Sequence, residues 1–168
     1  TVSDRNPMIS DPLKKTDCSL VSDGAAALVL VADDLLQDAP KAVRMRGVAQ
    51  VNDLLPMSRR DILAFEGPRR AIHAAYDRAG VTVADIDVAE VHDATSFCEI
   101  YQAEMMGFCP IGEGGNFIGS GATMLDGKIP INTSGGLVSK GHPIGATGVS
   151  MIYEVAVQLR GEAEKRQV

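Results

Sequence analysis

One stretch of the sequence combines an imidazole with an unusual density of glycine. Residues 132–148 contain five glycines around His142 and run directly into an apolar helical pattern. Glycine adopts positive φ and lets the backbone approach a ligand closely. A histidine just before a helix N-terminus lies among unpaired N–H groups and beside the positive end of the helix dipole. Such a site can hold a developing anion next to a base.

Two other interpretations of this stretch stay open on the residues alone. A glycine-rich turn before a helix can be structural, with His142 serving only as a hydrogen-bonded residue. A phosphate-binding loop needs Gly-Lys-Ser/Thr at the start of its helix, whereas here Gly141 precedes His142 and Pro143. The dinucleotide signature is incomplete as well, because residues 119–121 lack the third glycine. The two strongest nucleotide-binding signatures are therefore missing.

A second candidate pair, His92-Asp93, follows the apolar run Ile86–Val91. This run predicts a strand, and the carboxyl end of a strand is where ligand-facing residues lie in open α/β sheets. Ser96 and Glu99 have the spacing of a capping box, so a helix is expected to start near Ser96. Strand, His-Asp turn and helix then form one unit whose turn is its functional edge.

The remaining pattern predicts the elements that must position these residues. A continuous apolar run at Ala25–Val31 predicts a strand buried on both faces, and alternation over Val43–Val51 predicts a half-exposed strand. Residues 33–42 are expected to form a short helical or turn connection. Apolar spacing over Arg69–Ala79 predicts an amphipathic helix ended by Gly80.

Further along, residues 107–128 carry seven glycines and no periodic pattern, which predicts a long loop. An apolar stripe over residues 149–159 predicts a helix closed by Gly161. His73 falls on the polar side of its predicted helix, so we expect it at the surface.

Composition excludes several classes of function. The 168 residues correspond to about one domain, and 45% of them are hydrophobic, enough to bury a core. The net charge is −6, and the 16 basic residues form no stripe, which argues against nucleic-acid binding. No apolar run approaches the ~18–20 residues that a membrane span needs. We expect a soluble, cytoplasmic protein without a signal peptide.

The three cysteines, Cys18, Cys98 and Cys109, lack any Cys-x-x-Cys spacing. An odd number without that spacing fits reduced thiols better than a disulfide framework or a zinc site. His92 together with Cys98 and Cys109 has no recognised ligand pattern either. We therefore expect no bound metal.

The motifs together resemble the thiolase superfamily. The stretch Ser134–Gly148 is similar to its C-terminal Gly-His-Pro signature, and Ser22–Ala27 and Glu90–Asp93 agree in order and spacing. His-Asp in place of the more usual Asn-Glu resembles the sterol-carrier-protein or lipid-transfer branch. The resemblance implies an α/β, thiolase-like fold, with a mixed sheet packed by helices. Residues 1–20 would end a preceding loop region, and residues 21–168 would form an incomplete C-terminal domain without its last strands.

The resemblance also implies an activity. Thiolases transfer acyl groups between coenzyme A thioesters, by thiolysis or Claisen condensation, and their nucleophilic cysteine would lie in a missing N-terminal half. By resemblance, His142 activates that cysteine and binds an oxyanion, His92 binds the second oxyanion or its water, and Asp93 orients His92. Coenzyme A contacts are carried over to Ser19, and to the loop glycines Gly141 and Gly145.

The implied partners follow from the same resemblance. An acyl-CoA would be a substrate rather than a bound cofactor, and the N-terminal half and a homodimer or homotetramer would complete the enzyme. The alternative is a thiolase-like retro-aldolase, or a non-catalytic scaffold, that works with a small OB-fold protein. The presence of the nucleophilic cysteine in the parent polypeptide discriminates between the two.

Overall fold

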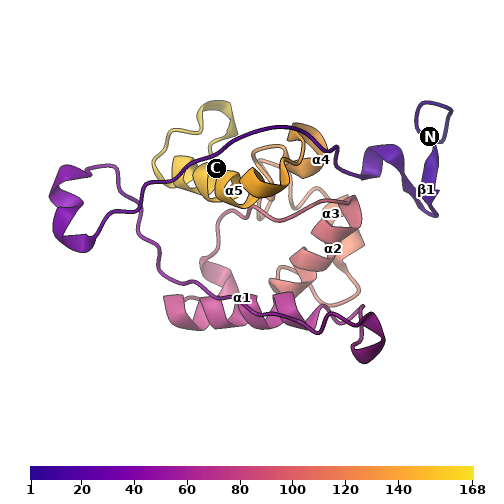
Figure 1. Ribbon diagram of the computed structural model, residues 1–168, viewed down its shortest axis with the longest axis horizontal. Coiled ribbons are helices and arrows are strands. Elements are labelled where there is room, and N and C mark those ends of the chain that lie inside the picture. Colours follow the sequence, from indigo (N-terminus) through magenta and orange to yellow (C-terminus); the bar gives the residue numbers. More distant parts are fainter.

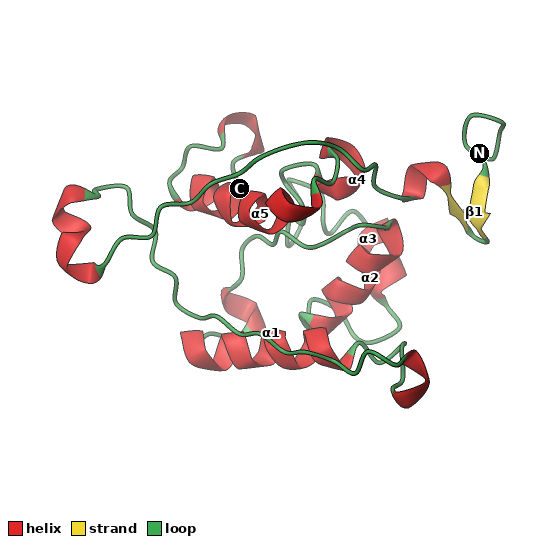
Figure 2. Ribbon diagram, in the orientation of Figure 1, coloured by secondary structure: helices red, strands yellow, loops and turns green.

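The computed structural model describes all 168 residues, and it is mostly helical. Figure 2 shows helices and loops forming the body, with the strands confined to the N-terminal end. The α-helices are α1 (Glu66–Ala79), α2 (Ser96–Met105), α3 (Gly114–Gly119), α4 (Gly136–Lys140) and α5 (Ile144–Leu159). Short 3-10 helices cover Lys15–Asp17, Asp33–Asp38, Met57–Arg59, Val83–Asp85 and Glu164–Arg166. The strands are β1 (Met8–Ser10) and β2 (Leu13–Lys14), an antiparallel pair.

The helices lie on two sides of the molecule. Figure 1 shows α1 along one side, α4 and α5 along the other, and α2 with α3 between them at one end. The β1–β2 hairpin and the N-terminus project away from this body. Between the 3-10 helix at Lys15–Asp17 and residue 32 the chain runs uncoiled and passes alongside α5. None of the helices is long and apolar enough to cross a membrane.

The buried core is small and lies under the His-Asp turn. Six buried hydrophobic side chains contact one another in it: Ala89, Val91, Ala103, Phe108, Ile129 and Ile131. Ala89 and Ile131 form an isolated parallel bridge. The Ala89 amide donates to the Pro130 carbonyl at 3.0 Å, and the Asn132 amide donates to the Ala89 carbonyl at 2.8 Å. The expected strand at Ile86–Val91 is therefore reduced to this one bridge.

The mixed sheet expected from the sequence is not present in this chain, so that part of the fold prediction is wrong. Neither Ala25–Val31 nor Val43–Val51 forms a strand, and neither makes a backbone–backbone hydrogen bond. Val29 and Leu30 are 88% and 83% exposed, whereas burial on both faces was expected. The physical reason is that strand propensity gives a ladder only where a neighbouring segment supplies donors and acceptors.

Side chains of α1 hold the 43–51 segment in place of a neighbouring strand. The Arg46 guanidinium donates to the Ala79 carbonyl at 2.8 Å, and the Arg78 guanidinium donates to the Val48 carbonyl. Gly47 packs so closely on the helix that an added Cβ would overlap the Ala75 carbonyl oxygen. This mostly exposed segment thus lies on a helix rather than in a sheet.

The predicted helices are confirmed more closely than the strands. α1 and α5 occupy the expected stretches, and Gly80 ends α1 in the left-handed region with φ 65°. The expected turn at residues 33–42 contains a 3-10 helix, and His73 is exposed as predicted. α3 inside the glycine-rich stretch and the N-terminal hairpin were not predicted.

The start of α2 corrects the expected capping box. Ser96 is the first helical residue rather than the N-cap, which is Thr95 without a side-chain capping bond. The Thr95 hydroxyl instead contacts the Cys98 sulfur at 3.2 Å. Glu99 turns away from the helix start, and the Asn132 amide donates to its carboxylate at 3.5 Å. The tertiary contact of Glu99 therefore replaces the local one.

Two glycine variants test how the backbone conformation controls helix stability. Gly80→Ala should lower the free energy of unfolding by about 1 kcal/mol, because alanine is strained at positive φ. Gly115→Ala in α3 should instead raise it by about 0.5–1 kcal/mol, because Gly115 has ordinary helical φ and open space around its Cα. Urea unfolding of both variants measures the difference. Equal effects of the two substitutions would contradict this account.

Candidate functional site

Two histidines fifty positions apart in the sequence meet in space. The ring centroids of His92 and His142 are 4.8 Å apart, with an angle of 80° between the ring planes. His142 is half-buried and His92 is exposed. The structure therefore brings together the two imidazoles that the sequence placed in separate motifs.

The His142 ring makes one hydrogen bond, through Nδ1. Its Nδ1 lies 2.8 Å from the hydroxyl of Thr147, a buried residue in the first turn of α5. The Thr147 hydroxyl donates its one proton to the Pro143 carbonyl at 3.2 Å. In the tautomer with the proton on Nδ1, the hydroxyl accepts from Nδ1–H and the lone pair of the neutral ring lies on Nε2. This tautomer leaves Nε2 available as a base.

The backbone of His142 is tied to the uncoiled N-terminal segment. Its amide donates to the Leu20 carbonyl at 2.9 Å, and Val21 forms a parallel bridge with it. Gly141, at φ 91°, is needed here because an added Cβ would overlap the Ser22 side chain. The Ser22 hydroxyl oxygen is buried there without a hydrogen-bond partner.

The turn that carries His92 is held by groups from several elements. The Val91 amide donates to the Asn132 side-chain oxygen at 2.8 Å. The Ser19 amide donates to the Ala94 carbonyl at 2.8 Å. Because Ser19 is followed by Leu20, one short segment touches both histidine loops.

Asp93 binds the start of the glycine loop. Its carboxylate is buried and accepts a hydrogen bond from the Leu137 amide at 2.7 Å, at the start of α4. Gly136, at φ 62°, admits the carboxylate because an added Cβ would overlap it. Asp93 makes no hydrogen bond to the His92 ring, so its observed contact positions the glycine loop rather than the imidazole.

Burial and neighbouring charge shift the pKa values of His92 and Glu99. Partial desolvation, with a smaller contribution from His142, lowers the pKa of His92, and Asp93 opposes this shift. Burial, reinforced by the Asp93 charge, raises the pKa of Glu99, whereas the hydrogen bond from Asn132 lowers it. The neutral form of His92 is therefore favoured.

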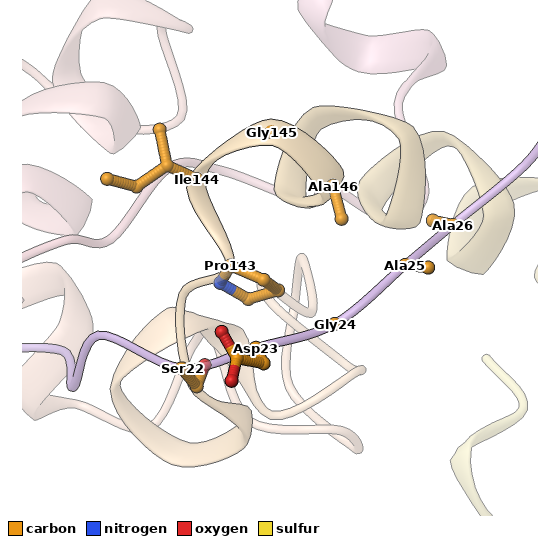
Figure 3. A pocket seen from close by; sticks show the side chains of 9 residues that line it. All are labelled: Ser22, Asp23, Gly24, Ala25, Ala26, Pro143, Ile144, Gly145 and Ala146. Atoms are coloured by element: carbon orange, nitrogen blue, oxygen red, sulfur yellow. The ribbon is translucent and has the colours of Figure 1, made fainter.

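A groove lies beside the Gly-His-Pro loop. Ser22–Ala26 line one wall and Pro143–Ala146 line the other, around a volume of about 360 Å³ (Figure 3). Gly145, one of the expected coenzyme A contacts, lies in this lining. Gly141 and Ser19 lie outside the lining, on the two segments that lead into it.

No thiol of this chain lies at the histidine pair. The Cys18 sulfur donates to the Lys14 carbonyl at 3.7 Å, and the Cys98 sulfur contacts Thr95. Burial, with the nearby Glu104 and Glu113 charges, raises the pKa of Cys109. The structure also contains no group of three or more His, Cys, Asp or Glu side chains that could hold a metal ion.

Several residues of this site were not singled out from the sequence. Thr147, Asn132 and Gln102 each bind a histidine ring or the backbone of the His-Asp turn. Thr147 and Asn132 lie inside the glycine-rich stretch, so their polar side chains beside His142 could have marked them as site residues. Gln102 carried no signal, because a polar residue on a surface helix is ordinary.

A family described as "Thiolase C-terminal domain-like" matches residues 49–168. The chain belongs to the thiolase family. Over 163 residues this thiolase chain is 44% identical to an acetyl-CoA acetyltransferase of Methanothermobacter thermautotrophicus, covering 96% of this chain and 43% of the relative. It is 40% identical to human sterol carrier protein 2, covering 95% and 30%. The thiolase chain thus spans less than half of the length of these relatives.

More distant comparisons agree on the fold. The thiolase chain is 30% identical to the benzoylsuccinyl-CoA thiolase subunit BbsB of Thauera aromatica, over 96% of this chain and 42% of the relative. A solved chain of the "Ltp2-ChsH2(DUF35) aldolase" aligns with a TM-score of 0.76 at 24% identity, covering 92% of this chain and 41% of that one. This likeness shows a shared fold.

Titration of His92 tests the electrostatics of the pair. Its pKa should lie below the ordinary value of ~6.5 and should rise part of the way back in His142→Ala, because one cause of the shift is removed. The free energy of unfolding should fall as pH drops from ~6.5 through the lower folded pKa, since folding favours the neutral ring. Proton NMR of the imidazoles measures the pKa, and urea unfolding at several pH values measures the free energy of unfolding.

The chain has only three histidines, so the variant His73→Gln assigns the signals by elimination. A His92 signal that titrates at or above the ordinary value would contradict the lowered pKa.

Proposed function

We propose that this chain supplies the histidine-bearing part of the active site of a CoA-dependent thiolase-type acyltransferase. The reaction would be acyl transfer between coenzyme A thioesters, by thiolysis or Claisen condensation. The single observation that carries the proposal is the pair of imidazoles, 4.8 Å apart, with Nδ1 of His142 held by Thr147. The names of the relatives, acetyl-CoA acetyltransferase and benzoylsuccinyl-CoA thiolase, support the class of reaction.

In the proposed mechanism His142 acts as a base through Nε2. It takes the proton from an attacking thiol, whose sulfur then bonds to the thioester carbonyl carbon while the electron pair of the carbonyl moves to its oxygen. The thiolate of coenzyme A leaves as the carbonyl re-forms and recovers the proton from His142. Thr147 keeps the ring in the required tautomer throughout, because its hydroxyl donates its proton to the Pro143 carbonyl and accepts from Nδ1–H.

His92 is proposed as the donor to the oxygen that becomes negative. A neutral imidazole donates one N–H, and preorganised donors at such an oxygen lower the barrier by about 3–4 kcal/mol each. Asp93 contributes indirectly, by holding the start of α4 beside the Gly-His-Pro loop. We place the nucleophilic cysteine in a part of the enzyme outside this chain, since none of its three thiols contacts His142.

Coenzyme A is proposed to bind along the groove between Ser22–Ala26 and Pro143–Ala146. Gly145 would lie against the pantetheine arm, with Gly141 and Ser19 setting the walls. The exposed apolar side chains of Val29 and Leu30 support packing against an N-terminal thiolase half or a second subunit in a homodimer or homotetramer.

Kinetics of histidine variants in the complete polypeptide test the proposal. His142→Ala should lower kcat by ~10²–10⁴-fold, because it removes the base that takes the proton from the attacking thiol. His92→Asn should cost less, since an amide can still donate a hydrogen bond. Steady-state thiolysis of acetoacetyl-CoA measures both, beside thermal melts. Activity of His142→Ala within about tenfold of wild type, with a collapsed melting temperature, would make the histidine structural.

Thr147→Val tests the tautomer separately from the base. Valine is nearly isosteric but cannot accept from Nδ1–H, so kcat should fall by about tenfold or more while the fold is kept. The pH dependence of kcat measures whether the base has changed its protonation behaviour. A kcat and a pH profile equal to wild type would show that Thr147 does not control His142.

The alternative proposal is a retro-aldolase or a scaffold that works with a small OB-fold protein. The solved aldolase chain shares the fold, and that likeness alone does not favour its reaction here. Acylation of the complete polypeptide separates the two: incubation with acetyl-CoA should leave a covalent acetyl thioester on a cysteine, detected by mass spectrometry. Absence of any acyl-enzyme, with binding of an OB-fold partner, would favour the alternative.

A further inference from the structure

The side chain of Gln102, on α2, binds both the amide and the carbonyl of the His92 backbone. The His92 amide donates to the Gln102 side-chain oxygen at 3.2 Å, and the Gln102 side-chain nitrogen donates to the His92 carbonyl at 2.8 Å. This exchange of one N–H and one C=O is the pattern of a hydrogen-bonded pair in an antiparallel sheet. The Gln102 side chain thus takes the place of a neighbouring strand.

A third hydrogen bond fixes the orientation of the Gln102 amide. Its nitrogen also donates to the Cys98 carbonyl at 3.0 Å, one turn earlier in α2. Rotating the amide by 180° would put its oxygen against two carbonyl oxygens and its N–H groups against the His92 amide. Only one orientation satisfies every partner, so Gln102 is a rigid link between α2 and His92.

No other group holds the main chain of His92. Its amide and carbonyl make no backbone–backbone hydrogen bond. Asn132 binds Val91, the residue before it, and Leu137 binds Asp93, the residue after it. The residue that carries the exposed imidazole depends on Gln102 alone for both of its main-chain hydrogen bonds.

We propose that Gln102 is the positioning residue of His92, and that it sets the separation between the His92 and His142 rings. The inference rests on the proposed acyl transfer, in which both imidazoles act on one reacting carbonyl. Gln102 touches neither ring by a hydrogen bond, so its effect passes through the His92 backbone. An error of about 1 Å in such a group can cost ~10²-fold in rate.

The test uses Gln102→Met in the complete polypeptide, because methionine keeps the length of the side chain and removes all three hydrogen bonds. The expected result is a kcat about 10- to 100-fold lower, with KM changed little, since His92 acts on the reacting oxygen rather than on the coenzyme. Gln37→Met is the matched control: Gln37 is exposed and makes no side-chain hydrogen bond. It should leave kcat unchanged.

A double-mutant cycle with His92→Ala separates positioning from general stability. When the imidazole is absent, Gln102→Met should change kcat by less than about twofold, because its effect is exerted through that ring. Equal losses of kcat in the presence and absence of His92, or a lower melting temperature with unchanged kcat, would overturn the proposal.

Titration of His92 gives a readout that does not need activity. In Gln102→Met the pKa of His92 should move toward the ordinary imidazole value, because the ring is no longer held against His142. The Gln37→Met control should leave it in place. An unmoved His92 titration would overturn the positioning role even if the protein had no acyl transfer activity. A moved titration in a protein without that activity would refute the proposed function and leave the link from Gln102 to His92 intact.

Discussion

The buried carboxylate of Asp93 is the constraint on which the two histidine loops depend. A buried charge needs a hydrogen-bond donor, and here the donor is the Leu137 amide at the start of α4. The approach requires Gly136, because a side chain at that position would overlap the carboxylate. One interaction therefore ties the His-Asp turn to the glycine loop that ends at His142. Gly136 of this loop therefore serves close packing against Asp93.

The site is assembled without a regular sheet. In the described chain, the turn around His92 has no strand ladder, and side chains supply the missing partners: Asn132 for Val91 and Gln102 for His92. The segment Ser19–Leu20 adds one main-chain bond to each histidine loop. Each of these bonds has a net worth of only about 1 kcal/mol, so their joint geometry, rather than any one of them, keeps the rings together.

Two apolar segments have a strand-like sequence pattern but form no strand and are largely exposed. Ala25–Val31 and the alternating 43–51 segment have the composition of strands, yet neither forms a ladder with another segment. Both therefore leave main-chain donors and acceptors unused by other backbone groups. The chain spans 43% and 30% of the length of the two relatives, the acetyl-CoA acetyltransferase and human sterol carrier protein 2.

The sequence by itself determined the family, α1, α5 and the helical body of α2, and the two motifs that carry His92 and His142. These features depend on local spacing, because a helical period, a terminal glycine and a glycine-rich loop are each recognised from a short stretch of sequence. The tertiary structure decided the partner of Asp93, the true start of α2, the loss of the expected strands and the roles of Thr147 and Gln102. Each of these depends on which distant group comes within hydrogen-bond distance. Gln102 is ten residues beyond His92 and on another element, so only the folded chain could bring its amide to that backbone.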